Sequence, residues 1–140
     1  MSAEDMNVEK MSDEHWKRKL TRKQYEVCRN KGTEAPFSGE YYYSKDKGIY
    51  KCVCCSNELF SSETKFDSGT GWPSFYAPIN QNNVEYLVDD SFGMKRIEIN
   101  CKKCGAHLGH VFDDGPHPTN KRYCINTVSL KLAKENARMR

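Results

Sequence analysis

The sequence has no long hydrophobic run, and only 37% of its 140 residues are hydrophobic. No stretch approaches the roughly 20 apolar residues that a membrane-spanning helix needs, so we expect no membrane association. Residues 1–19 are polar and charged and lack the apolar core of a signal peptide. We therefore expect a cytoplasmic protein, in a compartment where cysteines stay reduced and more often hold metal or carry out redox chemistry.

An excess of either charge is also missing. The chain has 22 basic and 19 acidic side chains, a net charge of +3, and the two signs are spread along it. Recognition of nucleic acid depends on a basic face interleaved with aromatic residues, and the sequence contains no such pattern. We therefore expect no nucleic acid partner. Without a long apolar stripe, we also expect a monomer.

The sequence contains no low-complexity segment and no domain linker. Its length predicts one domain over residues 12–133, between a disordered tail at 1–11 and a charged tail at 134–140. Thr21 and Gln24 form a capping box that predicts a helix over 22–30, and Trp16 with Leu20 indicates a shorter helix before it. Aromatic and β-branched residues predict strands for most of the remainder. The expected strands are 41–43, 49–53, a hairpin of 84–88 with 94–99, and 122–132, with a loop at 65–73 and a turn at 113–118.

What the chain does have is seven cysteines, and four of them form two Cys-x-x-Cys pairs. The pairs are Cys52 with Cys55 and Cys101 with Cys104. One pair alone would also fit a redox disulfide, but two pairs, each followed by a small residue, favour one tetrahedral zinc ion. The pairs are 45 residues apart (101 − 55 − 1), so the fold must bring them together. Four thiolates leave a zinc ion no open position, so any chemistry must lie elsewhere.

Cys124 lies in a strand-like segment outside these pairs. Residues two apart in a strand share a face, so Arg122, Cys124 and Asn126 should point the same way. A guanidinium and an amide beside a thiol favour the nucleophilic thiolate. The alternative is an unreactive cysteine in a β core, where thiols are common. This segment alone does not decide between the two.

Two histidines, His107 and His110, follow the second cysteine pair, with Gly109 allowing a bend between them. Histidine can donate a proton near neutral pH. Zinc ligation or surface exposure are the alternatives, but four thiolates already satisfy the metal. The histidines therefore favour a reactive Cys124.

Three motifs then resemble one known family. They are residues 65–75 (KFDSGTGWPSF), 107–112 (HLGHVF) and 122–126 (RYCIN). Over residues 20–132 the chain resembles methionine-R-sulfoxide reductase B. The resemblance implies a mainly β, β-tent-like fold of two antiparallel sheets with short N-terminal helices and a four-cysteine zinc site. It also implies reduction of methionine R-sulfoxide, free or in oxidised proteins.

The resemblance further assigns roles. Cys124 attacks the sulfoxide sulfur and becomes a sulfenic acid, while His107 or His110 protonates the departing oxygen. Trp72 and Phe112 bind the substrate, with Trp72 as an aromatic wall for its S-methyl group. An ordinary core position is the alternative for Trp72. Three further residues position and polarise the site: Asn126, Arg122 and Asp114.

One position departs from the family pattern. Many members have a cysteine at the position of Thr70, where it resolves the sulfenic acid into a disulfide that thioredoxin reduces. Thr70 cannot do this, so we expect Cys28 to take its place, followed by thioredoxin. Cys54, otherwise a bystander of the zinc site, is the rival, and direct reduction by an external thiol is the third possibility.

Two hypotheses from other classes compete with the reductase. A zinc-bearing module that binds nucleic acid or protein explains the cysteine pairs but not Cys124, the histidines or the Trp72 loop. A chaperone or exchange factor on the same fold would make Cys124 structural, and Cys124→Ser would then leave its function intact.

Overall fold

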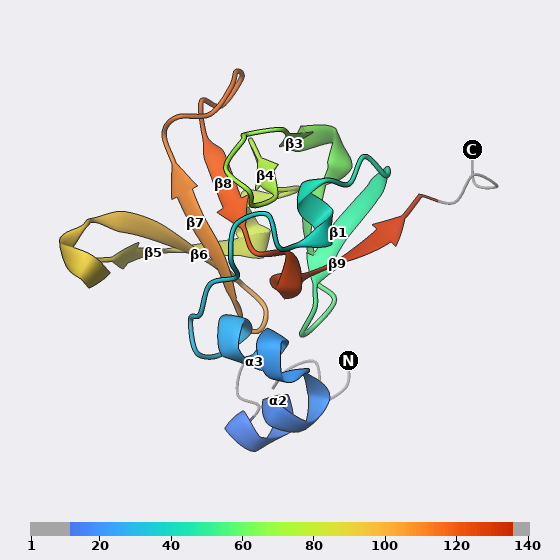
Figure 1. The fold of residues 1–140 in the computed structure, drawn as a ribbon, viewed down its shortest axis with the longest axis vertical. Helices are drawn as coiled ribbons and strands as arrows, with labels where there is room; N and C mark the ends of the chain where they lie inside the picture. Colours follow the sequence, from blue (N-terminus) through green and yellow to red (C-terminus); the bar gives the residue numbers. More distant parts are fainter. Residues whose placement is uncertain (1–11, 136–140) are drawn as a thin grey trace.

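The computed structural model describes residues 12–135, which form two antiparallel β-sheets with two short helices below them (Figure 1). The smaller sheet has the order β2-β1-β9, and the larger has the order β3-β4-β8-β7-β6-β5. The bounds of the smaller sheet are β1 Gly48–Cys52, β2 Glu58–Ser61 and β9 Leu130–Lys134. Those of the larger are β3 Lys65–Phe66, β4 Ser74–Phe75, β5 Val84–Asp89, β6 Arg96–Cys101, β7 His107–Phe112 and β8 Arg122–Ile125. The predicted mainly β fold of two antiparallel sheets is confirmed.

The helices are α2, Asp13–Lys19, and α3, Arg22–Cys28. The capping box of Thr21 and Gln24 is present, as predicted, and α3 ends at Cys28, two residues before its predicted end. Trp16 is buried, and the guanidinium of Arg29 lies 4.6 Å from the centre of its ring. Within the described part of the chain, neither helix has the length and apolar character needed to cross a membrane.

Aromatic side chains join the two sheets in the core. Phe60 of the smaller sheet stacks on Phe75 of the larger one, with ring centres 4.5 Å apart. Tyr50 meets Phe75 edge-on at 5.2 Å, and Tyr123 lies 5.7 Å from Phe60. All four side chains are buried. Offset and edge-on pairs of this kind stabilise the contact between the sheets beyond the free energy of area burial.

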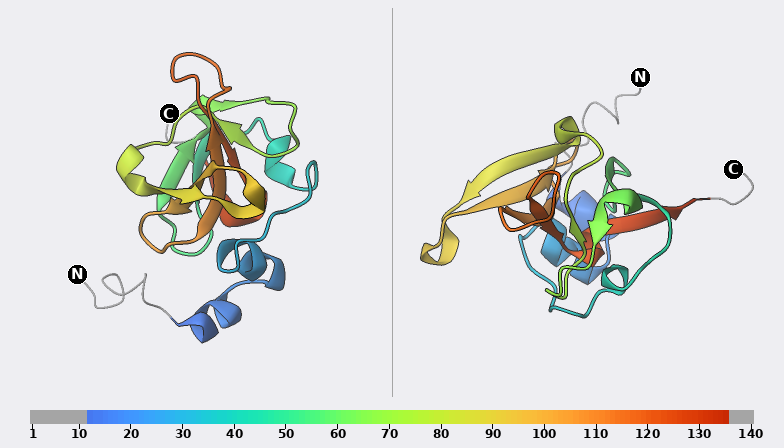
Figure 2. Two further views of the ribbon diagram at one scale, coloured as in Figure 1. Left: turned by 90° about the vertical axis from the view of Figure 1, so that its left-hand side faces the viewer. Right: turned by 90° about the horizontal axis from the view of Figure 1, so that it is seen from above.

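The β5–β6 hairpin was predicted, and the structure confirms it. It projects from the body of the molecule (Figures 1 and 2), and β5 forms the edge of the larger sheet. The strand β5 ends one residue later than predicted, at Asp89, and β6 spans Arg96–Cys101 instead of the predicted 94–99. This extension places Asp89 directly opposite Arg96.

Two strand predictions were wrong. Residues 122–132 form not one strand but β8 and β9 in different sheets, separated by the 3-10 turn η6, Thr127–Ser129. The Asn126 N–H bonds to the Leu108 carbonyl, and η6 then carries the chain across to β1. Residues 41–43 were expected as a strand, but Glu40–Tyr42 form the 3-10 turn η2.

The single domain over residues 12–133 stays a prediction. The strand β9 continues to Lys134 by pairing with β1, so it ends past the predicted Leu132. The tail at 1–11 and residues 136–140 of the C-terminal tail lie outside the described residues.

Candidate active site

The fold brings the two cysteine pairs together at strand ends. One pair occupies the turn after β1 and the other the turn after β6, and their four sulfur atoms all lie within 4.8 Å of one another. The sulfur atoms of Cys52 and Cys104 are 3.7 Å apart, and those of Cys55 and Cys101 are 3.5 Å apart. A tetrahedron with metal–sulfur bonds of about 2.3 Å requires sulfur separations of roughly 3.8 Å. These four cysteines can therefore hold one metal ion, as the sequence predicted.

Both cysteine turns have the same backbone. Ser56 N–H bonds to the Cys52 carbonyl and Gly105 N–H to the Cys101 carbonyl, each at 2.8 Å. Ser56 and Gly105 both have a left-handed backbone, with φ of 68° and 78°. Residues with bulky side chains rarely adopt this backbone conformation, which explains why a small residue follows each cysteine pair.

Hydrogen-bond donors surround the cysteine cluster. Asn57 Nδ2 lies 3.5 Å from the Cys101 sulfur, and Arg29 Nη1 lies 3.8 Å from the Cys104 sulfur and 3.1 Å from its carbonyl oxygen. Such donors offset the negative charge that four thiolates bring, so this outer layer suits a metal-bound set.

A separate cavity of about 270 Å³ contains Cys124. It lies on the larger sheet, where β8 and β7 meet the loop between β3 and β4. Arg122, Cys124 and Asn126 all line it, so the prediction that they share a face is confirmed. The cavity also brings in three further predicted residues: Trp72, His110 and Phe112. His107, Asp114 and Cys28 are not among its lining residues.

Cys124 has a neighbour on each adjacent strand. Ser74 of β4 pairs with it on one side and His110 of β7 on the other. Directly paired residues in an antiparallel sheet have Cβ atoms only about 5 Å apart, so the thiol and the imidazole are neighbours in the cavity. Gly109 allows β7 to come this close, since a Cβ there would overlap the Cys124 carbonyl oxygen.

Burial raises the pKa of the Cys124 thiol to about 11. The Arg122 charge and a hydrogen bond from the Thr70 hydroxyl act in the opposite direction. The sequence predicted that Arg122 would favour the thiolate, and its effect has that sign. Burial outweighs it, so the free protein holds Cys124 mainly as the thiol at neutral pH.

The two histidines share a face because of a β-bulge. In a regular strand, residues three apart point to opposite sides, but the register of β6 and β7 shifts between Ile99 and Asn100. The imidazole rings consequently meet edge-on, with centres 5.6 Å apart. The predicted bend between His107 and His110 is therefore a bulge.

Each histidine has its own carboxylate. His110 Nε2 lies 2.8 Å from Asp89 Oδ2, and Asp89 also contacts Arg96 at 3.3 Å. Hydrogen bonds from Ser91 and then His110 lower the pKa of Asp89 and keep it ionised.

His107 is buried behind His110. Its Nδ1 lies 2.7 Å from Oε2 of Glu98, which is also buried. Burial lowers the pKa of His107, with Glu98 acting against that shift. His110 faces the cavity, whereas His107 supports it from behind.

Arg122 is held at the cavity wall by Asp114. Its Nε and Nη2 donate to the two carboxylate oxygens at 2.9 and 3.1 Å, and its guanidinium lies 4.5 Å from the centre of the Phe112 ring. Asp114 itself is exposed and outside the cavity, so it acts on the site through Arg122.

Asn126 and Trp72 are both hydrogen-bonded to the backbone of Glu34. Asn126 Nδ2 donates to the Leu108 carbonyl at 3.0 Å, and its Oδ1 accepts the Glu34 N–H at 3.1 Å. Trp72 Nε1 donates to the Glu34 carbonyl at 3.0 Å. The amide of Asn126 is thus occupied in holding the bulge and the cavity wall.

Cys28 is placed apart from Cys124. It is buried at the end of α3, with its sulfur 3.6 Å from the Ser129 hydroxyl and hydrogen-bonded to Cys54. Cys54 is buried as well and is not one of the four clustered cysteines.

Sequence reasoning missed several residues of the site. Thr33 and Arg96 line the cavity, while Asp89 and Glu98 orient the histidines. Thr70, identified from the sequence only as the position of the family's resolving cysteine, also lines the cavity. The predicted hairpin could have indicated Asp89 and Arg96. Extending its first strand by one residue, from Val88 to Asp89, pairs Asp89 with Arg96. No local pattern links Glu98 to His107, which depends on the bulge.

Comparison with known proteins shows the family to which the chain belongs. The SelR domain matches residues 20–134. The peptide methionine sulfoxide reductase MsrB of Methanosarcina mazei is 62% identical over 124 residues, covering 89% of this chain and 89% of that protein. The protein of the same name from Leptospira interrogans is 56% identical over 131 residues, covering 93% of this chain and 100% of its own. Mouse mitochondrial methionine-R-sulfoxide reductase B3 is 57% identical over 121 residues, covering 86% of this chain and 48% of its own. The resemblance predicted from the three motifs is confirmed, and the chain belongs to the SelR-domain family, that of the peptide methionine sulfoxide reductases MsrB.

Proposed function

We propose that this chain is a peptide-methionine (R)-S-oxide reductase that uses Cys124 as its nucleophile. The observation that carries the proposal is the direct pairing of Cys124 with His110 inside a cavity walled by Trp72 and Phe112. A nucleophile beside a proton-transferring group, with an aromatic wall for a thioether, suits attack on a sulfoxide. The names of the matched relatives support the same activity.

The first step converts the thiol and the sulfoxide into a sulfenic acid and a thioether. The Cys124 sulfur attacks the sulfoxide sulfur and forms an S–S bond while the sulfoxide oxygen takes up a proton. The hydroxyl then moves to the Cys124 sulfur as the S–S bond and the substrate S–O bond break, which leaves Cys124 as S–OH and releases the methionine thioether. The thiol proton is transferred to that oxygen, so the step is balanced without another reactant. Cys124 is oxidised and the methionine sulfur is reduced.

His110 is the residue we assign to the proton transfer. Its Nε2 is engaged by Asp89, so exchange with the cavity falls to Nδ1. Asp89 stabilises the imidazolium that forms if His110 takes the Cys124 proton before passing it to the oxygen. His107 positions the His110 ring, with Glu98 fixing its own orientation.

Arg122 contributes charge stabilisation. Its guanidinium lies beside Cys124 and acts to lower the thiol pKa, while Asp114 prevents it from swinging away. Trp72 and Phe112 would contact the S-methyl group, and Asn126 holds the wall in place. This arrangement stabilises the thiolate most when the sulfoxide displaces water from the cavity.

Recycling of Cys124 needs a reductant. Cys28 remains our proposed resolving thiol, with thioredoxin reducing the resulting disulfide. Because Cys28 lies beside Ser129 and Cys54, pairing with Cys124 requires the end of α3 to move. Direct reduction by an external thiol needs no such movement. Mass mapping after one equivalent of sulfoxide separates them: a Cys28–Cys124 disulfide supports Cys28, and Cys124 joined to Cys54 or to nothing overturns it.

The four clustered cysteines would hold one structural zinc ion, which closes the ends of the β1–β2 and β6–β7 turns onto each other. Four thiolates leave zinc no open position, so it takes no part in the reaction. We further propose that the protein works as a monomer in the cytoplasm, where thioredoxin is available. The substrates would be oxidised proteins and free methionine R-sulfoxide.

The test is turnover of methionine R- and S-sulfoxide, assayed separately with a thiol reductant. We expect the R form alone to react. Absence of turnover for both forms, by folded and zinc-loaded protein, would overturn the proposal.

A further inference from the structure

Phe37 combines two unusual features. Its backbone is left-handed, with φ of 66°, although it is a bulky aromatic residue, and its side chain is 52% exposed. The left-handed region is uncommon for residues other than glycine, asparagine and aspartate, and it persists only where the surroundings impose it. Burial does not explain the phenylalanine, because half of the side chain faces solvent. A functional use of the ring is the alternative.

The segment carrying Phe37 is built against the Trp72 loop. The Phe37 N–H donates to the Gly71 carbonyl at 2.7 Å. A Cβ on Gly71 would lie 2.7 Å from the Phe37 nitrogen and 2.8 Å from its ring atom Cδ2. The ring therefore lies directly against the residue that precedes Trp72. Through Gly71, Phe37 therefore adjoins the loop that supplies Thr70 and Trp72 to the wall of the cavity with Cys124.

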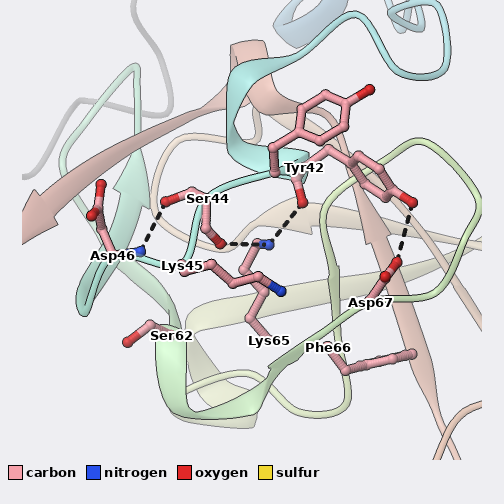
Figure 3. A pocket seen from close by; sticks show the side chains of 9 residues that line it. Tyr42, Ser44, Lys45, Asp46, Ser62, Lys65, Phe66 and Asp67 are labelled. Carbon is pink, nitrogen blue, oxygen red and sulfur yellow. Dashed lines mark hydrogen bonds between the residues drawn. The ribbon is translucent and has the colours of Figure 1, made fainter.

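Two further rings extend this surface. Phe37 meets Tyr42 edge-on at 5.2 Å, and Tyr42 meets Tyr43 at 4.9 Å. Tyr43 is 60% exposed. The Tyr42 hydroxyl donates to Asp67 at 3.2 Å, which ties the rings to the same loop from its other end (Figure 3). We call Phe37, Tyr42 and Tyr43 the aromatic ridge.

Two members of the ridge, Tyr42 and Tyr43, line a hollow of about 240 Å³. Lys65 lies within it, and its ammonium is held 3.1 Å from each of the Tyr42 and Ser44 carbonyls (Figure 3). These bonds fix the backbone that carries Tyr42 and Tyr43. The two tyrosine rings therefore extend from an ordered backbone segment. Less conformational entropy is then lost when a ligand binds to them.

We propose that the aromatic ridge docks the polypeptide that flanks a methionine sulfoxide, while the oxidised side chain occupies the Cys124 cavity. The inference rests on the proposed function and narrows its substrate to extended polypeptide with apolar neighbours. Free methionine sulfoxide ends at its own amino and carboxyl groups, so it gains nothing from Phe37. A polypeptide continues beyond the cavity, where exposed aromatic rings provide rigid contact area.

The experiment compares two substrates. One is N-acetylated methionine (R)-sulfoxide, and the other is a hexapeptide with methionine (R)-sulfoxide between apolar residues. For Phe37→Ala we expect the ratio of kcat/KM values, peptide over N-acetylated substrate, to fall about two- to ten-fold, the effect of losing one aromatic contact. Phe37→Tyr should keep the ratio.

Phe37→Gly separates docking from a structural role. Glycine adopts φ of 66° without strain, so we expect its melting temperature not to fall while its peptide ratio falls as in Phe37→Ala. A phenylalanine retained for stability would instead show a lower melting temperature with an unchanged ratio. An unchanged kcat/KM ratio in both Phe37→Ala and Phe37→Gly would overturn the proposal. So would a lower melting temperature of Phe37→Gly with an unchanged ratio.

Val88→Ala is the matched control, because Val88 is 57% exposed on β5. Its neighbour Asp89 points to His110, so Val88 points to the opposite face of the sheet. We expect the kcat/KM ratio of Val88→Ala to equal that of the unaltered protein. A fall as large as that of Phe37→Ala would overturn the specific role of the ridge. A dimer that depends on Phe37 in sedimentation, with unchanged kinetics, would assign the ridge to self-association and overturn peptide docking. If the unaltered protein reduces neither substrate, the proposed function fails instead.

Discussion

Cysteine occupies two contrasting environments in this molecule. At the ends of β1 and β6, four sulfur atoms lie within 4.8 Å of one another, surrounded by N–H donors from Arg29 and Asn57. On β8, Cys124 stands alone between Ser74 and His110, at the wall of a cavity. The first arrangement can hold one metal ion, which would leave none of its thiolates free to react. The second leaves one thiol at the wall of a cavity, with the His110 imidazole beside it on the adjacent strand. We therefore propose that the same side chain serves stability at one place and reactivity at the other.

The largest effect should come from Cys124→Ser. Because a serine hydroxyl cannot replace the thiol as nucleophile at sulfur, we expect turnover of the R-sulfoxide to fall at least about 1,000-fold. Zinc content and the far-UV circular dichroism spectrum should stay unchanged, since Cys124 lies outside the cluster. Retention of full activity would return Cys124 to a structural role and bring forward the chaperone hypothesis.

Removing one thiol of the cluster should instead change zinc content and stability. In Cys104→Ser we expect zinc content below one equivalent and a free energy of unfolding lower by roughly 3 kcal/mol or more, because metal binding stabilises the fold. Elemental analysis and urea denaturation measure these. Cys54→Ser is the control, being buried beside the cluster but not part of it, and it should keep its zinc. Full zinc occupancy in Cys104→Ser would contradict the four-cysteine site.

The two histidines sharpen the account of Cys124. We expect His110→Asn to lower kcat about 100-fold, the usual scale for a lost proton-transferring group. His107→Asn should have a smaller effect, because His107 does not line the cavity. The measurement is kcat over a range of pH for both variants. A larger loss in His107→Asn would reverse the assignment.

The smallest predicted effects concern the charge beside Cys124. With a pKa of about 11, the rate of Cys124 alkylation by iodoacetamide should rise about tenfold per pH unit between pH 7 and 9. Arg122→Met removes a charge that lowers this pKa, so alkylation at pH 8 should slow about three- to tenfold. Asp114→Asn should slow it less, because Arg122 keeps its charge. Faster alkylation in Arg122→Met would contradict the direction of the Arg122 effect.

Much of the site was accessible from sequence, since local spacing encodes it. The x-x spacing of the cysteine pairs and the alternation of Arg122, Cys124 and Asn126 both survive folding, because tight turns and strands translate sequence distance directly into geometry. The division of 122–132 into two strands was not accessible. The chain there is continuously β-prone, and only the bond from Asn126 to Leu108 shows where it leaves one sheet for the other.

The partners of the histidines required three-dimensional information. Glu98 lies nine residues before His107 on another strand, and the β-bulge rather than the sequence spacing sets which residues meet. The strand predicted at residues 41–43 was wrong for a similar reason. Tyr41 packs edge-on against Tyr50, and its hydroxyl accepts the Leu132 N–H, which suits a 3-10 turn at that place. The net pKa of Cys124 also depended on burial, which the sequence pattern did not measure.

The central claim is that Cys124, and not the cluster, reacts with the sulfoxide. It is tested by adding one equivalent of methionine R-sulfoxide to reduced Cys28→Ser protein with dimedone present, which traps sulfenic acids, and following zinc release at the same time. The account predicts one dimedone adduct, on Cys124, with no zinc released and no adduct from the S-sulfoxide. An adduct on a cluster cysteine, or zinc release in step with methionine formation, would contradict it.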